Sequence, residues 1–436
     1  MAWHWTAAGG RQRKKGGGPP SPVGPPGPPA AEAEVPELRG AAAGPGGRGR
    51  GAGFSPPKLL LAALASVTVL TLCVRGGWAG GRLLQRKSGG DRVLVTGGAG
   101  YIGSHAVKRL LEDGKRVTIV DNLSRGNLGA VGVLQGLAAN NQLRFERVDL
   151  GDKAEVCRVF REQPDIDLVM HFAAVAYVGE SVADPTRYYH NITSNTLGLV
   201  ECMLEHGVKR LIYSSTCATY GNPEKLPITE ATPTVPINPY GQAKLMSENI
   251  IRDVAKSNPE LQVGILRYFN VYGSDEAGVL GEFPRPELRA MGRITGACFD
   301  AALGAVPELK ILGTNHPTKD GTCVRDFIHV VDLIDAHVLL QDHLGNPPPL
   351  YNVGTGKGVS VREIVEACKK VTGRPIKVVE QAEARPGDYA AVFADNAKIR
   401  TELGWTPKYT DVEQGLAHAW AWRSKNPNGY GAPGGL

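Results

Sequence analysis

The chain has 436 residues, enough for two ordinary domains or for one large domain with a smaller lobe. Its formal net charge is +6, and residues 1–58 supply +5 of it through eight Lys or Arg and three acids. The remainder is nearly neutral, so we expect no nucleic-acid-binding surface. Seven Cys are scattered without a Cys-x-x-Cys pair or a Cys/His ligand spacing, so we expect neither a disulfide framework nor a metal site.

The N-terminal part contains a tail and one apolar run. Residues 1–58 are dominated by Gly, Pro, Ala and Arg, a composition typical of disorder. An uncharged run, LLLAALASVTVLTLCV, follows at 59–74. As a helix it would cover about 24 Å, which suits a thin bilayer of roughly 27 Å. A buried core helix is disfavoured because nothing nearby offers packing, and a cleaved signal peptide would lie nearer the N-terminus. We therefore expect one transmembrane signal anchor, followed by a stem at 75–91.

From residue 92 onward, strand-like and helix-like segments alternate. The strand-like segments read RVLVT, RVTIVD, LRFERVDL, LVMHFAA, RLIYSST and VGILRYFN. Short apolar runs that alternate with helical patterns predict a doubly wound parallel sheet in an α/β fold. After about residue 270 the rhythm becomes irregular. We therefore expect a Rossmann domain at 92–270 and a smaller substrate-binding lobe at 271–436, with segments that return to the sheet.

A glycine-rich turn, GGAGYIG, follows the first strand and opens a helix. Gly97, Gly100 and Gly103 would allow a tight turn and a close backbone approach to a pyrophosphate. Asp121 ends the second strand, where a carboxylate would bind a ribose 2′-hydroxyl and repel a 2′-phosphate, and Asp149 closes the third strand, near adenine. Either acid alone is equally well explained as a helix N-cap. The three features in this order predict a bound dinucleotide, NAD in preference to NADP.

Tyr240 and Lys244 lie four residues apart in YGQAK, a spacing that places both on one face of a helix. A Lys ammonium and a positively charged nicotinamide would both favour the phenolate and lower the Tyr pKa. Such a Tyr is suited to take a proton from an alcohol while NAD⁺ takes a hydride. Thr216 ends an intervening strand and would bind the same substrate oxygen.

At this point the chain resembles the UDP-sugar 4-epimerases of the extended short-chain dehydrogenase/reductase family. The resemblance covers residues 92–436 and rests on VLVTGGAGYIGSH, DNLSRG, HFAAVAYVGES, YYHNITSN, YSSTCATYG, NPYGQAK, LRYFNVYGS, DGTCVRDFIHVVDL and YNVGTGKG. With the apolar run and GRITGACFDAALG, the chain is most similar to the plant enzymes that interconvert UDP-L-arabinose and UDP-D-xylose.

The resemblance implies a role for several residues. Thr216, Tyr240 and Lys244 would be catalytic. The residues expected to contact NAD are Gly97, Gly100, Tyr101, Ile102, Gly103, Asp121, Asn122, Asp149, Leu150, Phe172, Ala173, Asn191, Lys244 and Phe269. The UDP-sugar would contact Thr216 and Tyr240 through its O4, and its UDP part Asn270, Arg325, Arg385 and Asp388. Ala176 departs from the pattern, since some relatives place a Lys near the cofactor there.

The residues after Thr216 separate related reactions. Related dehydratases carry Asp-Glu at that point and related decarboxylases a Glu nearby, whereas this chain has Cys217 and Ala218. Elimination is therefore disfavoured, and reversible oxidation at C4 remains, with the 4-keto sugar turning before the hydride returns. The alternatives are a UDP-glucose/UDP-galactose 4-epimerase, a decarboxylase or dehydratase, and a non-catalytic NAD-binding protein, which the intact Thr216, Tyr240 and Lys244 disfavour. Pentose and hexose substrates cannot be distinguished at this level.

The same resemblance implies a homodimer and a single-pass type II protein with its catalytic domain in the Golgi lumen. Positive residues flank the apolar run on both sides, so charge does not fix the orientation. His171 and His329 lie beside strand-like runs and are expected to be packed and hydrogen-bonded, and Cys217 to be a small buried residue. Asn122 and Asn191 head N-x-S/T sequons but coincide with expected cofactor contacts, so we expect no glycans there.

Overall fold

The computed structural model describes residues 91–384 and 387–431. The predicted tail, the apolar run 59–74 and almost all of the stem lie outside these ranges, and so does Arg385. Among the described residues, none of the helices combines the length and the apolar character that crossing a membrane requires. The membrane anchor therefore stays a prediction.

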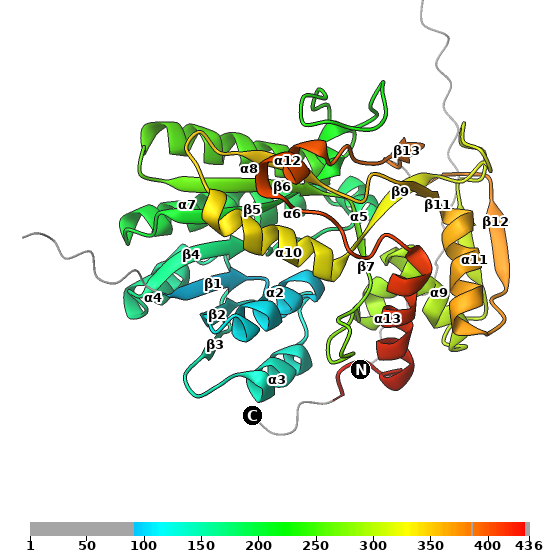
Figure 1. Ribbon diagram of the computed structural model, residues 1–436, viewed down its shortest axis with the longest axis horizontal. Helices are drawn as coiled ribbons and strands as arrows, with labels where there is room; N and C mark the ends of the chain where they lie inside the picture. Colours follow the sequence, from blue (N-terminus) through cyan, green and yellow to red (C-terminus); the bar gives the residue numbers. More distant parts are fainter. Residues whose placement is uncertain (1–90, 385–386, 432–436) are drawn as a thin grey trace, which may run out of the picture. The chain divides into compact units, whose positions relative to one another are not determined.

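Seven parallel strands form the central sheet, in the order β10-β6-β5-β4-β1-β2-β3 (Figure 1). Their bounds are β1 Arg92–Thr96, β2 Arg116–Val120, β3 Leu143–Glu146, β4 Ile166–His171, β5 Arg210–Thr216, β6 Gln262–Tyr268 and β10 Leu350–Val353. From β1 the chain proceeds outward through β2 and β3 on one side and through β4, β5 and β6 on the other. This reversal confirms the doubly wound fold and creates a crevice at the carboxyl ends of β1 and β4.

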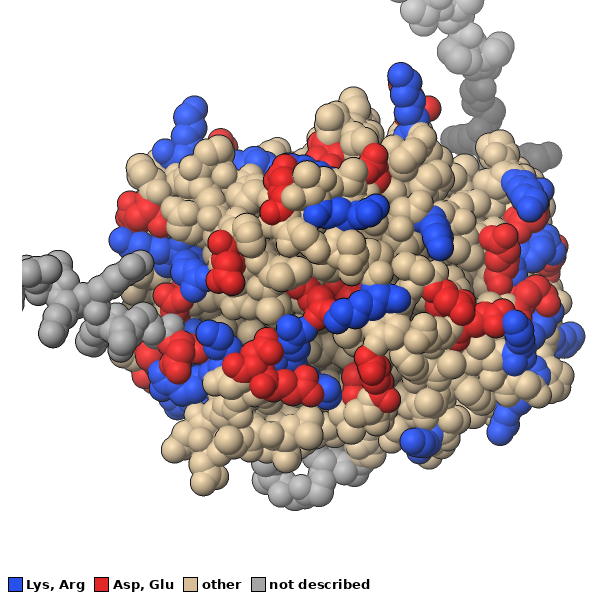
Figure 2. All heavy atoms as spheres, in the orientation of Figure 1, with Lys and Arg blue, Asp and Glu red and all other residues tan. Residues whose placement is uncertain are grey.

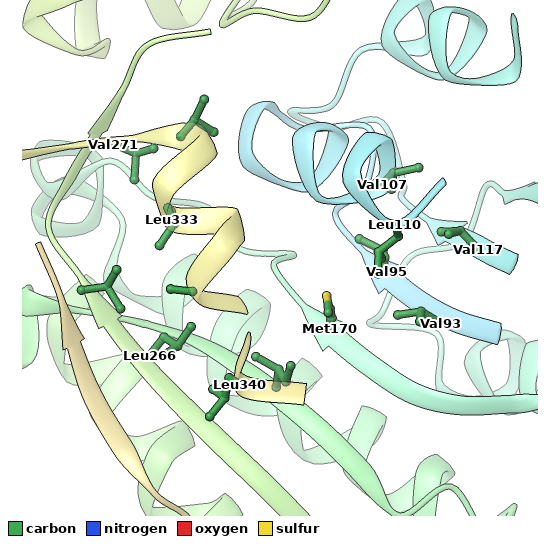
Figure 3. Packing of buried hydrophobic residues seen from close by; sticks show 14 of the residues in the cluster. Val93, Val95, Val107, Leu110, Val117, Met170, Leu266, Val271, Leu333 and Leu340 are labelled. Atoms are coloured by element: carbon green, nitrogen blue, oxygen red, sulfur yellow. The ribbon is translucent and has the colours of Figure 1, made fainter. Parts of the chain in front are cut away.

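Helices cover both faces of the sheet because successive strand residues point in opposite directions. Val93 and Val95 of β1 belong to one buried cluster, and Leu94 belongs to another. The first cluster is completed by α2 Tyr101–Glu112, α3 Leu128–Leu137, α10 Val330–Leu340 and α12 Ala397–Leu403. The second is completed by α4 Lys153–Glu162, α7 Asn195–Glu205 and α8 Pro239–Ser257. Figure 3 shows Val93, Val95 and Met170 of the sheet beside Val107 and Leu110 of α2.

From residue 270 the chain builds two small sheets, which form a second lobe beside the main sheet. One contains β7 Asn270–Tyr272, β9 Val324–His329, β11 Gly358–Ser360 and β13 Ala391–Val392, and the other pairs β8 Leu309–Leu312 with β12 Val378–Gln381. Three helices pack on them: α9 Ile294–Ala302, α11 Val361–Thr372 and α13 Val412–Lys425. Two elements from this part of the chain belong with the main sheet: strand β10 pairs with β6, and helix α10 packs on one face of the sheet.

Several shorter elements lie between these helices and strands. They are α5 Val178–Ala183, α6 Pro185–Tyr188, the π-helical turn η1 Tyr189–Ser194, and the 3₁₀ turns η2 Cys217–Tyr220, η3 Pro286–Met291 and η4 Gln341–His343. On the face shown in Figure 2, acidic and basic side chains are interspersed. This mixture agrees with the nearly neutral charge of the chain after residue 58.

One sequence-based expectation is wrong: Cys157 and Cys202 form a disulfide. The two residues are 45 positions apart, and they meet because α4 and α7 pack side by side on the same face of the sheet. The spacing of cysteines along the chain does not predict which helices pack together, so this disulfide could not be predicted from the sequence. The other cysteines of the described part of the chain are all buried: Cys217, Cys298, Cys323 and Cys368.

Candidate active site

A cleft with about 1350 Å³ of empty space, part of it open to solvent, lies at the carboxyl ends of β1, β2 and β4. Most of the residues predicted to contact a dinucleotide line it. They are Gly97, Gly100, Tyr101, Ile102, Gly103, Asp121, Asn122, Asp149, Leu150, Phe172, Ala173, Asn191 and Lys244. The structure therefore assembles at one place residues that are spread over almost 150 positions of the chain.

The glycine-rich turn forms one wall of this cleft. Gly97 has φ +71°, and a Cβ there would lie 2.7 Å from the backbone nitrogen of Ala173. A Cβ on Gly103 would lie 2.2 Å from the carbonyl oxygen of Gly97. Helix α2 begins at Tyr101 with neither a side-chain cap nor an acidic residue in its first turn. Its first N–H groups are therefore not taken by a side-chain cap, as a pyrophosphate-binding turn requires.

Two carboxylates lie where adenosine is expected. Asp121 accepts hydrogen bonds from the backbone N–H groups of Ala99 (3.1 Å) and Leu123 (2.8 Å), and burial raises its pKa. Asp149 accepts a 2.8 Å hydrogen bond from the side-chain amide of Asn122. Neither Asp121 nor Asp149 occupies a helix N-cap position, because those positions of α3 and α4 belong to Asn127 and Asp152. The N-cap alternative is therefore excluded, and both acids are left facing the cleft.

Two of the expected cofactor contacts differ in detail. Asn191 lines the cleft, and its side-chain oxygen accepts a 2.8 Å hydrogen bond from the backbone of Val175. Phe269 does not line this cleft but packs in a buried cluster with Tyr240. The preceding residue, Tyr268 at the end of β6, lines the cleft instead. Neighbouring residues at a strand end point to opposite sides, which a motif match alone does not resolve.

The predicted catalytic residues lie on two adjoining elements. Helix α8 starts at Pro239, where the Asn238 side chain caps it by accepting from the N–H of Gly241. Tyr240 and Lys244 are buried on the same helix. The Lys244 ammonium donates a 2.8 Å hydrogen bond to the carbonyl oxygen of Ser214 in β5 and lines the cofactor cleft. Two residues later, Thr216 ends β5, and its Oγ1 accepts from the N–H of Ala218.

Burial dominates the electrostatics of this set. It raises the pKa of Tyr240, while a hydrogen bond from Thr216 and the charge of Arg293 act in the opposite direction. Burial also lowers the pKa of Lys244 to about 7, partly offset by Glu248. The expectation that Lys244 lowers the Tyr240 pKa is therefore not met by the protein groups alone. A lower Tyr240 pKa needs positive charge beyond these side chains, and a nicotinamide cation would supply it.

The residues expected to hold UDP come from the second lobe. Asn270 begins β7, which pairs with β9, the strand that carries Arg325. Arg325 and Asp388 form a 2.5 Å ion pair, with side chains only 8% and 12% exposed. A guanidinium fixed in this way is oriented before any ligand binds.

The structure confirms that His171 and His329 are packed and hydrogen-bonded and that Cys217 is buried. His171 lies between the hydroxyls of Thr96 (2.7 Å) and Thr196 (3.1 Å), and burial lowers its pKa to about 3. His329 is buried and caps α10 by accepting from the N–H of Val331. Cys217 is buried, and burial raises its thiol pKa to about 12, which rules it out as a thiolate nucleophile at neutral pH.

Sequence reasoning missed two arginines that line the cleft. The Arg293 guanidinium lies 5.4 Å from the centre of the Tyr101 ring and pairs with Glu282. Arg125 lies 5.4 Å from the centre of the Tyr177 ring and pairs with Glu180. Together they place two guanidinium groups in the cleft, each paired with a carboxylate, whereas Ala176 stands where some relatives have a Lys. Arg125 belongs to the DNLSRG motif and was detectable there, whereas nothing in the sequence links Arg293 to Tyr101.

Comparison with known proteins gives consistent matches. Residues 93–354 match the model of the NAD dependent epimerase/dehydratase family. The chain is 58% identical over 377 residues to the probable UDP-arabinose 4-epimerase 3 of Oryza sativa subsp. japonica, covering 85% of this chain and 92% of the relative. It is 60% identical over 349 residues to UDP-arabinose 4-epimerase 1 of Arabidopsis thaliana, covering 80% and 83%.

The solved structures agree. UDP-glucose 4-epimerase from Bifidobacterium longum, in complex with NAD⁺ and UDP, matches with a TM-score of 0.73 and 42% identity. The match covers 78% of this chain and 99% of that one.

Proposed function

The chain belongs to the NAD dependent epimerase/dehydratase family, and on this basis we propose that it is an NAD-dependent isomerase that interconverts UDP-L-arabinose and UDP-D-xylose at C4. Epimerisation of a UDP-sugar follows from identities of 58% and 60% to UDP-arabinose 4-epimerases along most of the chain. The choice of a pentose follows from the same relatives, since UDP-glucose 4-epimerases such as that of Bacillus subtilis are only 44% identical.

One observation carries the reaction type. Thr216, Tyr240 and Lys244 lie on β5 and α8 beside the cofactor cleft, and the residues that follow Thr216 in η2 are Cys217 and Ala218. A hydroxyl, a phenol and an amine can move the O4 proton, but no carboxylate follows Thr216 to abstract a proton from C5. The set therefore suits oxidation and reduction at a single carbon rather than elimination.

Each of these side chains has a distinct task. The residues that line the cleft would hold NAD, which would supply the hydride acceptor for C4 and the hydride donor for the opposite face of the sugar. Tyr240 takes the O4 proton as the C4–O4 bond becomes a carbonyl, and returns it when the alcohol is restored. Thr216 holds the same oxygen by a hydrogen bond. Lys244, fixed by a hydrogen bond to Ser214, lines the cleft and would contact the cofactor there. Arg325, oriented by its ion pair with Asp388, would anchor the UDP part.

Product analysis tests the proposal. The purified chain is incubated separately with UDP-xylose, UDP-arabinose, UDP-glucose and UDP-galactose, and the products are separated by chromatography. We expect the two pentoses to interconvert to the same equilibrium mixture from either side without added NAD. Release of CO₂, a deoxysugar product, or faster conversion of the hexoses than of the pentoses would contradict it.

We also propose a location, a single-pass type II protein with the catalytic part in the Golgi lumen. The uncharged run at 59–74 supports an anchor. The Cys157–Cys202 disulfide supports a lumenal catalytic part, since disulfides persist mainly in oxidising compartments.

A homodimer completes the proposal. Leu197 of α7 and Met246 of α8 are 38% and 40% exposed, on two helices that pack against each other. Exposed apolar side chains on adjacent helices suit a helical interface between two copies. Sedimentation equilibrium of the purified protein distinguishes a dimer from a monomer.

A further inference from the structure

The last described segment of the chain runs from helix α13 of the second lobe to helix α3, which packs on the main sheet. We name residues 426–431, which follow helix α13, the C-terminal strap. Within it, Tyr430 packs against α3: a Cβ added to Gly129 would lie 2.4 Å from the Cβ of Tyr430. Its ring also lies 5.0 Å from the ring of Trp422 in α13. The strap therefore reaches α3 only because position 129 has no side chain.

The Tyr430 hydroxyl holds a loop of the cofactor cleft. It donates a 2.7 Å hydrogen bond to the carbonyl oxygen of Gly281 and accepts a 3.0 Å hydrogen bond from the N–H of the same residue. Residues 281–284 and Tyr430 itself all line the cleft. On the other side of this loop, the Asn127 side chain donates to the carbonyl oxygen of Phe283 at 3.4 Å. Tyr430, this loop and the start of α3 thus form one continuous wall.

The strap is anchored at its base. Arg423 donates to the carbonyl oxygens of Asn426 (3.1 Å) and Pro427 (2.5 Å). The same guanidinium makes a 2.6 Å ion pair with Asp300, and the two side chains are only 6% and 10% exposed. A buried charge pair that also binds the strap backbone keeps this part of the chain in place.

We propose that Tyr430 is a positioning residue that retains NAD in the cleft, by tying the 281–284 loop to the strap and the strap to α3. The proposal rests on the proposed function, since it requires a dinucleotide in the cleft. The reaction gives retention a purpose: a cofactor lost between the two half-reactions would leave a 4-keto sugar and an inactive enzyme. Tyr430 touches no reacting atom, so its loss should change cofactor release and not the chemistry.

Two variants with matched controls test this role. Tyr430→Phe removes the two hydrogen bonds to Gly281, and Gly129→Ala forces the strap away from α3 while keeping the tyrosine hydroxyl. Tyr409→Phe is the first control, because the Tyr409 hydroxyl binds Glu276 and lies outside the cofactor cleft. Gly132→Ala is the second, because it lies on α3 and its added Cβ would meet nothing within 4 Å. The full chain is separated from free NAD by rapid gel filtration at successive times, and the absorbance of the NAD that remains bound gives the rate of loss.

We expect NAD to leave both test variants about tenfold faster than wild type or either control. In Gly129→Ala, which changes no residue of the cleft lining, turnover per NAD-loaded chain should stay within about twofold of wild type. If Tyr430→Phe fails to fold, Gly129→Ala still decides the outcome. Wild-type NAD retention in Gly129→Ala, or in a folded Tyr430→Phe, overturns the role of the strap and leaves the proposed function standing. A wild-type chain that holds no NAD overturns the proposed function itself.

Discussion

Cys157 of α4 and Cys202 of α7 are joined by a disulfide that connects two helices on the same face of the sheet. Helix α4 follows Asp149 and Leu150, and α7 includes Asn195, all of which line the adenosine side of the cofactor cleft. The bond therefore ties together the two elements that present these residues. Its loss should weaken both the fold and this end of the site.

The disulfide should stabilise the protein measurably. It closes a loop of 45 residues, and the chain-entropy model gives about 4 kcal/mol for that length. We expect Cys157→Ser with Cys202→Ser to lower the free energy of unfolding in urea by that order. Dithiothreitol should lower the stability of wild type and leave the double variant unchanged. Equal sensitivity of both proteins to the reductant would show that the thiols are not paired.

Replacing the proposed base should abolish turnover without emptying the cleft. Tyr240→Phe removes only the phenolic hydroxyl, so we expect activity to fall by about 10²–10⁴-fold. NAD should remain bound at the wild-type ratio, measured by absorbance of the denatured protein. Tyr351→Phe is the matched control, since the Tyr351 hydroxyl binds Glu402 away from the cleft. A Tyr240→Phe enzyme with half or more of wild-type activity contradicts the assignment.

Lys244 should make stability depend on pH. Burial lowers its pKa to about 7 in the folded protein, against 10.5 for the free side chain. Between pH 7 and pH 10.5 the Lys244 side chain is protonated in the unfolded chain but largely neutral in the folded protein. This difference in pKa lowers the free energy of unfolding most at or below pH 7, and its effect disappears at high pH. From pH 7 to 9 the NAD-free wild type should gain about 2 kcal/mol relative to Lys244→Met. Stability that changes with pH equally in wild type and Lys244→Met would contradict this prediction. Lys209→Met replaces an exposed lysine and is the control, so its stability should change with pH as that of wild type does.

Arg293 should affect the pKa of Tyr240, the proposed base. Its positive charge lowers the pKa of Tyr240, so Arg293→Met should raise that pKa further. We expect the rise of kcat with pH to move toward alkaline values, on the order of half a pH unit. Arg289→Met serves as the control, since the Arg289 guanidinium lies over the Phe283 ring and is absent from the cofactor cleft. An unshifted profile for Arg293→Met would mean that its charge does not reach the phenol.

Protease treatment of sealed Golgi vesicles should reveal the orientation. If residues 59–74 anchor a type II protein, the catalytic part survives until detergent is added, and an N-terminal tag is lost at once. Digestion of the catalytic part in intact vesicles would reverse the orientation. Recovery of the full-length chain in the soluble fraction would exclude the anchor.

The sequence by itself determined the parts of the site that lie within single strand-turn-helix units. Gly97, Gly100 and Gly103 follow one strand, and Tyr240 and Lys244 are one helical turn apart, so local spacing is enough to place them. The parallel sheet was also predictable, because apolar runs alternating with helical patterns leave few other arrangements. These features depend on interactions between residues close in the chain.

The tertiary structure decided what depends on distant segments or on burial. Cys157 meets Cys202, Arg293 meets Tyr101, and Tyr430 meets Gly281, each across a separation at which sequence carries no periodic signal. The direction of the Tyr240 pKa shift was likewise mispredicted for the protein groups. A Lys four residues away suggested a lower value, but removing a phenolate from water costs more than the neighbouring charges return. Burial is a property of the whole packed chain, and so only the fold could fix it.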